Sequence, residues 1–376
     1  MIVQLLSENL QNKLGLVSHA TSTRSQLPIL SNFLIKAKEG KLYISATDLE
    51  IGIEVQIQAK IEEEGSITVP AKTFLELLNN IPSGKISLNT TKEGLELKGE
   101  KIKTLFQTIP SEEFPKIYEE KGEKVMMIKK EDIVNDFGKV VFAAGQDQSR
   151  TALSGVLVES AVGEDGLGFL FVATDGYRLS LKKNIAKEEK TKKIKEGVSM
   201  LVPARVVREI ISISKDGEDV EVYVSKEKNQ IMFCQEEITL VGRLIEAEFP
   251  DYKKIIPQDF STKASFNREE MLRAVRACYV FSKETAGIVK ISVLKNKVVV
   301  SANTPSVGEN TIEVEAKTQG EENEIAFNAR YLLDILSNVE EEGIAFEMTG
   351  PLNPGVFKIE NDNSFLHLIM PIRVQA

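Results

Sequence analysis

Two aspartates in matching sequence contexts are the residues of this chain best suited to chemistry. Asp48 and Asp175 each close the string Ala-Thr-Asp, and a pair of carboxylates is the usual equipment of an acid–base hydrolase. The alternative role is structural, because an aspartate in a turn accepts hydrogen bonds from the backbone that follows it. Since the two strings lie in equivalent turns of separate repeats, the sequence favours the turn role. A repeat-built hydrolase remains the enzymatic alternative.

Other reactive side chains are scarce. His19 and His367 are the only two histidines, and no serine or cysteine lies in a recognisable nucleophile or phosphate-loop motif. Cys234 and Cys278, the only two cysteines, form no CxxC pair, so we expect reduced thiols. The sequence therefore predicts a protein that is not an enzyme and that holds neither a metal nor a cofactor.

The elements that carry these residues recur three times along the chain. Each repeat begins with a helical stretch in which apolar residues follow the spacing i, i+4, i+7, which places them on one face of an α-helix. The three sets are Leu10, Leu14 and Val17; Ile133, Phe137 and Val140; and Met271, Val275 and Cys278. We expect each of these helices to bury that face.

A strand pair and a second helix complete each repeat. The pair reads KLYISATDLEIGIEV, then GFLFVATDGYRLSL, then NKVVVSANTPSVGENTIEV. The residues that correspond at its turn are Thr47, Thr174 and Asn303. The second helix starts at Pro70, Pro203 and Asn328, since proline suits a first helical position and asparagine can cap a helix. Apolar residues follow each start at +4, +7 and +8.

Three such repeats predict the fold class α+β, with two helices packed on an antiparallel sheet in each domain. The strands come in adjacent runs, which excludes a series of parallel crossover units. The marker EEFPKIY at 112–118 returns as AEFPDYK at 247–253 and closes the first two repeats. We place the domains at 1–121, 122–258 and 259–376, with linkers near 118–124 and 256–264.

Charge and hydropathy restrict the functional classes. The chain has a net charge of -9 and no apolar run of about 18 residues, which predicts a cytoplasmic protein and argues against a simple basic nucleic-acid module. The helical stretches nevertheless carry a small positive excess. A basic residue recurs at +2 of every second helix and points away from its apolar face; these residues are Lys72, Arg205 and Arg330. Lys139, Arg273 and Arg276 lie outside the apolar faces of the first helices, with a solvated surface position as the alternative for each.

Five longer strings occur in order along the repeats. They are LPILSNFLI at 27–35, ATDLE at 46–50, ATDGYRLS at 173–180, EFPDYKKIIP at 248–257 and MPIR at 370–373. In these strings the chain resembles the bacterial DNA sliding clamp, the β subunit of the replicative polymerase, over essentially its whole length. The resemblance implies a head-to-tail homodimeric ring of six similar domains, with twelve helices around duplex DNA. Helix spacing agrees, because six helices about 9 Å apart close a circle only about 17 Å across, whereas twelve give about 34 Å and leave room for a duplex roughly 20 Å wide.

The resemblance also implies a pocket for short linear peptides of partners such as polymerase, clamp loader and repair proteins. Its residues would be Leu153, Thr174, Gly176, Tyr177, Arg178, Leu179, Pro250, Met370, Pro371, Ile372 and Arg373. Leucine, methionine and proline would form an apolar cleft, and arginine would bind carboxylate or carbonyl groups. The alternative for each apolar residue is a place in a core. Two features depart from the family pattern: Tyr177 stands where some relatives have histidine, and Gln375 and Ala376 extend past the usual end.

DNA contacts and a subunit seam follow from the same resemblance. Arg24 and Arg150 carry over as DNA contacts, and helix phase adds Lys72, Arg205, Arg273, Arg276 and Arg330. The seam would join Thr104 and Phe106 to Val280 and Phe281, with a core role for Phe106 as the alternative. The sequence thus predicts a processivity factor, a ring held on DNA by topology that tethers the replicative polymerase and other DNA-processing proteins. A purely protein-binding scaffold is the second alternative.

Overall fold

The computed structural model of the chain describes residues 1–22, 26–147, 149–163, 166–185, 197–214, 218–283 and 286–373. Residue contacts divide the chain into two compact units, one formed by Met1–Lys130 with Ser212–Leu244 and the other by Glu131–Ile211 with Ile245–Ala376. The second repeat is thus shared between the units, because some of its strands extend the sheet of the first repeat and the others extend the sheet of the third.

Two antiparallel sheets build the first unit. The five-stranded sheet has the spatial order β5 (Lys60–Glu63), β1 (Ile2–Leu6), β7 (Lys85–Thr91), β8 (Gly94–Lys98), β9 (Lys103–Phe106). The eight-stranded sheet has the order β10 (Glu123–Lys129), β15 (Asp219–Ser225), β16 (Gln230–Gln235), β17 (Ile238–Arg243), β4 (Ile51–Gln58), β3 (Lys41–Thr47), β2 (Asn32–Lys38), β6 (Gly65–Pro70). The pairing of β4 with β17 joins the first repeat to the second.

A twelve-stranded antiparallel sheet runs through the second unit. Its order is β14 (Ser199–Pro203), β11 (Gly155–Gly163), β12 (Gly166–Thr174), β13 (Arg178–Ile185), β25 (Asp362–Ile369), β24 (Gly355–Ile359), β23 (Gly343–Met348), β18 (Thr262–Asn267), β21 (Gly308–Gly320), β20 (Lys297–Thr304), β19 (Ile288–Leu294), β22 (Asn323–Asn328). The pairing of β13 with β25 joins the second repeat to the third.

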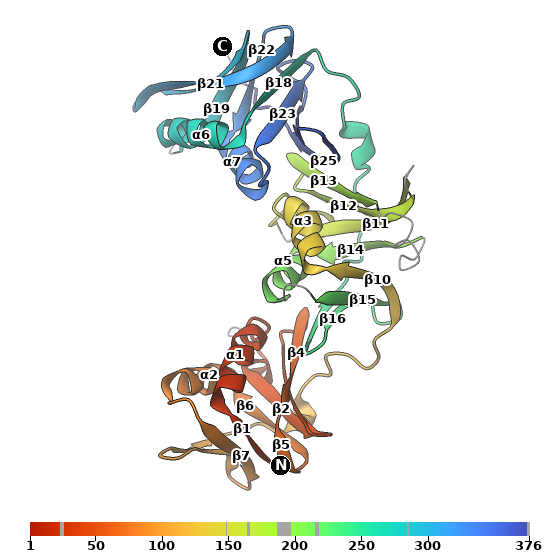
Figure 1. Cartoon of the computed structure of the whole chain (residues 1–376), viewed down its shortest axis with the longest axis vertical. Coiled ribbons are helices and arrows are strands. Elements are labelled where there is room, and N and C mark those ends of the chain that lie inside the picture. Colours follow the sequence, from red (N-terminus) through yellow and green to blue (C-terminus); the bar gives the residue numbers. More distant parts are fainter. Residues whose placement is uncertain are drawn as a thin grey trace. The chain divides into compact units, whose positions relative to one another are not determined.

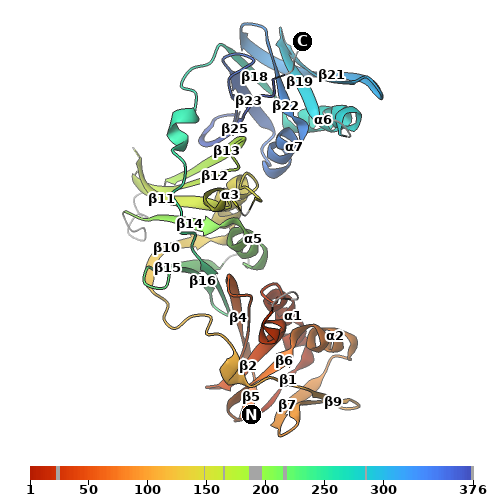
Figure 2. The ribbon, with the colours of Figure 1, turned by 180° about the vertical axis from the view of Figure 1, so that it is seen from behind.

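Six α-helices pack on these sheets in the described part of the chain. They are α1 (Ser7–Ser18), α2 (Ala71–Asn80), α3 (Lys130–Val141), α5 (Ala204–Ile213), α6 (Arg268–Ser282) and α7 (Ala329–Asn338). Figures 1 and 2 show them as side-by-side pairs, α1 with α2, α3 with α5 and α6 with α7. The apolar triplets that the sequence identifies in the first helix of each repeat are buried, none being more than 1% exposed.

The second helices begin within one residue of the predicted starts. α7 is capped by Asn328, whose side-chain oxygen accepts a hydrogen bond from Arg330 N at 3.0 Å. Pro70 and Pro203 lie just before α2 and α5 rather than at their first positions, and the ψ of Pro70, 112°, is not helical. A proline there costs no helical hydrogen bond, since the first N–H groups of a helix have no partner inside it.

Strand register confirms the alignment of the first two repeats, whose central hairpins end at the pairs of Thr47 with Gly52 and Thr174 with Leu179. In the third repeat the last pair is Thr304 with Gly308, and Thr304 is buried as the other two threonines are, whereas Asn303 is exposed. The predicted correspondence of Asn303 is therefore wrong by one residue. The predicted α+β class, with helices on antiparallel sheet in three repeats, is confirmed. Both cysteines are buried and unbridged, as expected for reduced thiols. Among the helices that the structure describes, none is long and apolar enough to cross a membrane.

Candidate functional site

Two equivalent turns hold Asp48 and Asp175. Asp175 Oδ1 accepts hydrogen bonds from the backbone N–H groups of Tyr177 at 2.8 Å and Arg178 at 3.0 Å. Asp48 makes the same two bonds in the first repeat, at 3.1 and 2.9 Å. Each carboxylate thus caps its own turn, as the sequence favours. Among the described residues, no group of three or more histidine, cysteine, aspartate or glutamate side chains is placed to hold a metal ion.

Thr174 and Gly176 shape the turn of the second repeat. Thr174 Oγ1 donates to Arg178 O at 2.6 Å and accepts from Gly176 N at 3.0 Å. Gly176 has a φ of 91°, a left-handed conformation that favours glycine. A Cβ at this position would lie 3.4 Å from Arg150 Nη1 and 3.9 Å from Leu153 Cδ1. The turn therefore packs closely against Arg150 and Leu153.

Arg178 is only 9% exposed, and its guanidinium has partners on several sides. Nε pairs with Asp175 Oδ2 at 3.1 Å, Nη1 pairs with Asp334, and Nη2 donates to Phe142 O at 2.8 Å. The guanidinium carbon lies 4.6 Å from the centre of the Tyr331 ring. Arg178 therefore ties the turn to α7. Asp334 and Tyr331 were not among the residues predicted from sequence, and their i, i+3 spacing on one helix was the only available signal.

The segment after β25 lies beside the same turn. Met370 N donates to Tyr177 O at 2.8 Å, and Ile372 N donates to a carbonyl of β22 at 2.8 Å. Tyr177 is 57% exposed and Met370 is 38% exposed. Pro371 and Ile372 are half-buried, while Arg373 is exposed. The backbone pairing thus brings two large, exposed side chains close together at the ends of β13 and β25.

The segment between β17 and β18 covers the face of β13 that lies away from α3. Leu179 is fully buried there, in an apolar cluster that includes Tyr252 and Leu368. The Tyr252 hydroxyl lies 3.5 Å from Glu159 Oε2, and burial raises the pKa of Tyr252 to about 12. Pro250, two residues earlier, is exposed. This cluster forms the floor of the site.

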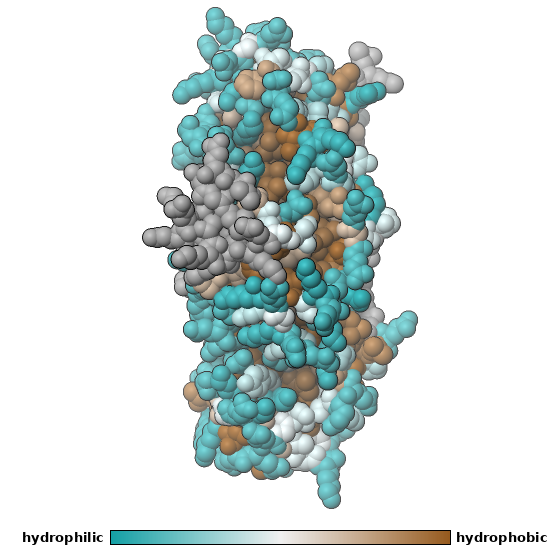
Figure 3. Space-filling view, turned by 90° about the vertical axis from the view of Figure 1, so that its right-hand side faces the viewer, coloured by the Kyte–Doolittle hydropathy of each residue, from teal (hydrophilic) through white to brown (hydrophobic). Residues whose placement is uncertain are grey.

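The predicted pocket residues therefore lie around one turn, at two depths. Thr174, Arg178 and Leu179 are buried and support the turn from below. The exposed members are Gly176, Tyr177, Pro250, Met370 and Arg373, and the half-buried members are Leu153, Pro371 and Ile372. On the face shown in Figure 3, apolar side chains reach the surface in separate patches between polar ones.

The joint between the first two repeats has the same backbone scheme with different side chains. Arg243 N donates to Glu50 O at 3.1 Å, the bond that Met370 makes in the second joint. Gly52 stands where the second repeat has leucine, and a Cβ on it would lie 2.3 Å from Ile117 Cγ2. An isoleucine of the chain's own linker thus fills the equivalent position.

A row of buried polar side chains lies behind the site, on the face of β13 that meets α3. Ser180 Oγ lies 2.6 Å from His367 Nδ1, and Asn184 Nδ2 hydrogen-bonds Asp136. Burial raises the pKa of Asp136 to about 6 and lowers the pKa of the fully buried His367 well below its ordinary value. These groups are enclosed between elements of the second and third repeats.

Lys139 does not point into solvent, so the helix-phase prediction for it is wrong. Its side chain is 8% exposed, and its ammonium pairs with Glu341. Helix phase shows which side of α3 faces its own sheet, but the segment before β23 in the third repeat covers part of the other side. Lys139 therefore belongs to the joint between the repeats.

The other helical basic residues are exposed; they are Lys72, Arg205, Arg273, Arg276 and Arg330. Lys72 and Arg273 each lie near a glutamate one turn away, at 3.9 and 4.0 Å, and both side chains remain more than two-thirds exposed. Arg150 is half exposed and pairs with Asp147 at 3.3 Å. Arg24, Gln375 and Ala376 lie outside the described residues.

The predicted seam residues lie on an edge strand and a helix end. β9, the last strand of its sheet, carries Thr104 and Phe106. Phe106 is 5% exposed and packs edge-to-face on Phe74 with ring centres 5.4 Å apart, so it fills a core within its own chain. Val280 is 58% exposed at the end of α6, and Phe281 beside it is half-buried.

Among the strand edges left unpaired in the part of the chain that the structure describes are β9 and the first part of β21. β9 pairs with β8 on one side only. β21 pairs with β20 along Gly308–Glu315, whereas its pairing with β18 begins at Ala316. Leu105 of β9, which is 42% exposed, was not among the residues predicted from sequence. Its place between two inward-facing neighbours on a strand was the available signal.

Three family models match consecutive parts of the chain. They describe the DNA polymerase III beta subunit: its N-terminal domain matches 1–118, its central domain 127–251 and its C-terminal domain 253–373. The chain is 29% identical over 367 residues to the beta sliding clamp of Caulobacter vibrioides, covering 96% of each chain. It is 26% identical over 375 residues to that of Staphylococcus epidermidis, again covering 96% of each. The solved structure of the Thermotoga maritima DNA polymerase III beta subunit is 26% identical and has a TM-score of 0.88, covering 100% of both chains.

Proposed function

This chain belongs to the DNA polymerase III beta subunit family, and on that basis we propose the assembly and the contacts through which it acts. It is a sliding clamp that serves DNA polymerase in processive synthesis. A clamp needs no chemistry for this purpose, because tethering a polymerase beside its template raises the local concentration of one for the other.

Two chains close head to tail into a ring of six domains. The unpaired edges of β9 and of the first part of β21 support this proposal. An unpaired edge offers backbone N–H and C=O groups to another strand. Lys101 lies beside the β9 edge, and Lys103 on that strand pairs with Glu96. Glu309, Glu313 and Glu315 lie along the unpaired part of β21, where Glu313 pairs with Lys297. Opposite charges favour pairing of β9 with β21 of a second chain over pairing of like edges, and such a head-to-tail contact closes when made twice.

Duplex DNA passes through this ring and meets the helices. Each second helix exposes a basic residue at the same position, namely Lys72, Arg205 and Arg330. Arg273, Arg276 and Arg150 add positive charge, and Arg24 is the further candidate from sequence. Sparse contacts with phosphate carry no base specificity and are screened by salt, which suits sliding.

Partner peptides bind around the turn of Thr174–Arg178. Because Arg178 is engaged by Asp175 and Asp334, we assign recognition of peptide carboxylates to the exposed Arg373. Tyr177 and Met370 supply apolar contact at the surface. Polymerase, clamp loader and repair proteins would share this site through short linear segments.

The chain performs no catalysis of its own and works in the cytoplasm. The absence of catalysis is supported by the two aspartates, whose carboxylates accept hydrogen bonds from backbone N–H groups of their own turns. Asp48→Asn should therefore leave clamp function largely intact, because an amide oxygen can cap the same turn.

Retention on DNA tests the ring directly. The protein is loaded onto nicked circular DNA by its clamp loader, the complex is isolated, and half of the sample is cut with a single-site restriction enzyme. A ring remains on the circular DNA, whereas it slides off the ends of the linear DNA. Equal retention on both forms would contradict topological binding.

A further inference from the structure

The first and second repeats differ sharply on the sheet face that lies under their linkers. In the second repeat this face is apolar, formed by Leu157, Leu170, Val172, Leu179 and Leu181. Strand register places Leu34, Tyr43, Ser45, Gly52 and Glu54 at the same positions in the first repeat. The second repeat therefore has an apolar face where the first repeat has a more polar one.

The linkers cover these two faces to different extents. In the second repeat the ring of Tyr252 packs into the apolar cluster, and its hydroxyl reaches Glu159. In the first repeat the aligned residue is Ile117, which packs toward Gly52, while Tyr118 turns to hydrogen-bond Glu54 at 2.8 Å. A cleft of about 540 Å³ remains between β2, β3 and the segment 111–118, lined by Tyr43 and Ser45 of β3 and by Ile117 and Tyr118 of the linker.

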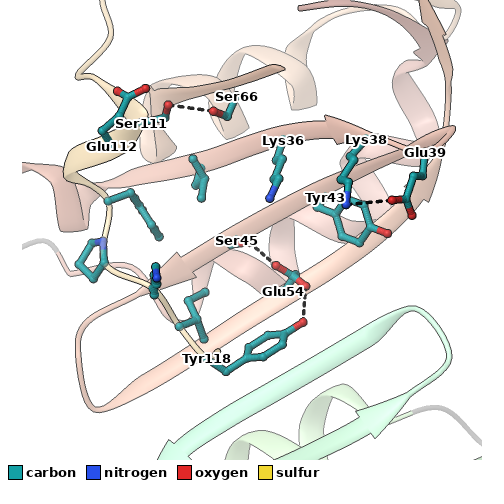
Figure 4. A pocket seen from close by; sticks show the side chains of 15 residues that line it. Lys36, Lys38, Glu39, Tyr43, Ser45, Glu54, Ser66, Ser111, Glu112 and Tyr118 are labelled. Atoms are coloured by element: carbon teal, nitrogen blue, oxygen red, sulfur yellow. Dashed lines mark hydrogen bonds and ion pairs between the residues drawn. The ribbon is translucent and has the colours of Figure 1, made fainter. Parts of the chain in front are cut away.

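Lys36 sets the charge of this cleft. Figure 4 shows its ammonium pointing into the cleft, whereas Glu112 points away. The other two carboxylates are engaged, since Glu54 accepts from Ser45 and Tyr118, and Glu39 pairs with Lys38 at 2.8 Å. Among the residues that the structure describes, Lys36 makes no ion pair. The cleft thus presents a cation beside the side chains of Tyr43, Leu34 and Phe114.

Strand register aligns Lys36 of the first repeat with Glu159 of the second repeat. Lys36 faces Tyr43 across the strands as Glu159 faces Leu170 in the second repeat. In the second repeat the occupant of this place is an aromatic ring whose polar tip donates a hydrogen bond to a carboxylate. With lysine in place of that carboxylate, the complementary occupant keeps an aromatic body and carries an acceptor, best an anion, at its tip.

We propose that this cleft is a second docking site, for a segment of a partner protein that presents an aromatic side chain next to an acidic one. The aromatic ring lies against Tyr43, Leu34 and Phe114, and the carboxylate pairs with Lys36. A volume of about 540 Å³ falls in the usual range for sites that hold a ligand of this size. The cleft is separate from the turn of Thr174–Arg178, so its occupancy does not depend on the peptide site proposed above.

Two matched dipeptides test the charge requirement on the full chain. The probes are N-acetyl-phenylalanyl-glutamate amide and its glutamine counterpart, observed by saturation-transfer NMR, which detects weak binding to a large protein. We expect transfer to the aromatic protons of the glutamate probe and at least tenfold weaker binding of the glutamine probe. Equal binding of the two probes overturns the proposal, as does absence of transfer to either.

Variants then locate the site. Lys36→Glu places in the first repeat the charge that the second repeat has, and it should abolish binding of the glutamate probe. Lys60→Glu is the matched control, because Lys60 is an exposed strand lysine of the same unit, 72% exposed and outside the cleft. Binding that survives Lys36→Glu, or that is lost equally in both variants, overturns the assignment. Melting curves of both variants verify that they fold.

Discussion

Two buried ionisable side chains between the second and third repeats make the stability of the protein depend on pH. Asp136 and His367 are both enclosed, and each has an atom with no hydrogen-bond partner among the described residues. Burial disfavours the charged form of both, but with opposite consequences for pH dependence, since one is an acid and the other a base. His367 lowers stability when the pH falls below the ordinary histidine value, because the unfolded chain then takes up a proton that the folded chain refuses.

Asp136→Asn should stabilise the protein above pH 6. The folded chain keeps the Asp136 proton up to a pKa of about 6, while the unfolded chain releases it near 3.8, so stability falls as pH rises through this window. Asparagine removes the buried charge, with a gain at pH 7.5 of at most about 3 kcal/mol, since one pKa unit corresponds to about 1.4 kcal/mol. Thermal melts of both proteins at pH 4 and pH 7.5 check this. The gain should vanish at pH 4, and a gain of equal size at both pH values would contradict it.

The two equivalent turns should respond differently to exchange of their central residues. Leu49 and Gly176 both adopt positive φ, of 80° and 91°. Gly176→Ala should cost about 1 kcal/mol, because a Cβ is strained in this backbone conformation. Leu49→Gly should change stability by less than about 0.5 kcal/mol, since relief of that strain is offset by the added freedom of glycine in the unfolded chain. Chemical denaturation of both variants measures the contrast, and similar losses would refute it.

At the scale of elements, an ion pair fastens α3 to the third repeat. Lys139 is 8% exposed and pairs with Glu341, which is 37% exposed. Glu341→Gln leaves a nearly buried ammonium without its carboxylate and should cost about 2 to 3 kcal/mol. Adding Lys139→Met removes the stranded charge and should restore most of that loss.

A double-mutant cycle on denaturation midpoints measures this coupling. The exposed pair of Lys297 and Glu313, 2.6 Å apart on neighbouring strands, is the matched control and should show a coupling below about 0.5 kcal/mol. Equal coupling in the two cycles would show that the Lys139 pair does not fasten the joint.

Elements within one repeat were predictable from sequence because their signals are local. Leu10, Leu14 and Val17 follow helical spacing and are buried, and Asn328 caps α7 as its type suggests. The alternating residues of each hairpin fixed its register and the alignment of Thr47 with Thr174. Periodicity reports how an element faces its own core, and that information suffices for fold class.

Contacts between repeats were not predictable in the same way. Lys139 was expected in solvent because the helical period of α3 carries no information about Glu341, some 200 positions later. Arg178 was expected to face a ligand, but much of its guanidinium is taken up by Asp175 and Asp334. The resemblance identified which residues surround the turn, whereas side-chain engagement depends on distances that only coordinates supply.

At the scale of the whole molecule, Val280→Asp should convert the dimer to a monomer. Val280 is 58% exposed at the end of α6, and a carboxylate in an apolar seam lacks a partner. Light scattering after size exclusion should give the mass of one chain instead of two, and loading onto nicked circles should fail. Leu352→Asp is the control, because Leu352 is equally exposed, at 61%, in a turn of the same repeat. A dimer that survives Val280→Asp excludes this seam.

The unpaired edges of β9 and β21 also affect how prone a chain is to aggregate before it has bound a second chain. A free edge invites any extended segment, so newly made chains at low concentration are exposed to misassembly and amyloid-like growth. Lys101 beside one edge and Glu309 and Glu315 on the other should repel like edges and slow that process. If these charges select the neighbouring chain as proposed, the same charges also act as gatekeepers against aggregation.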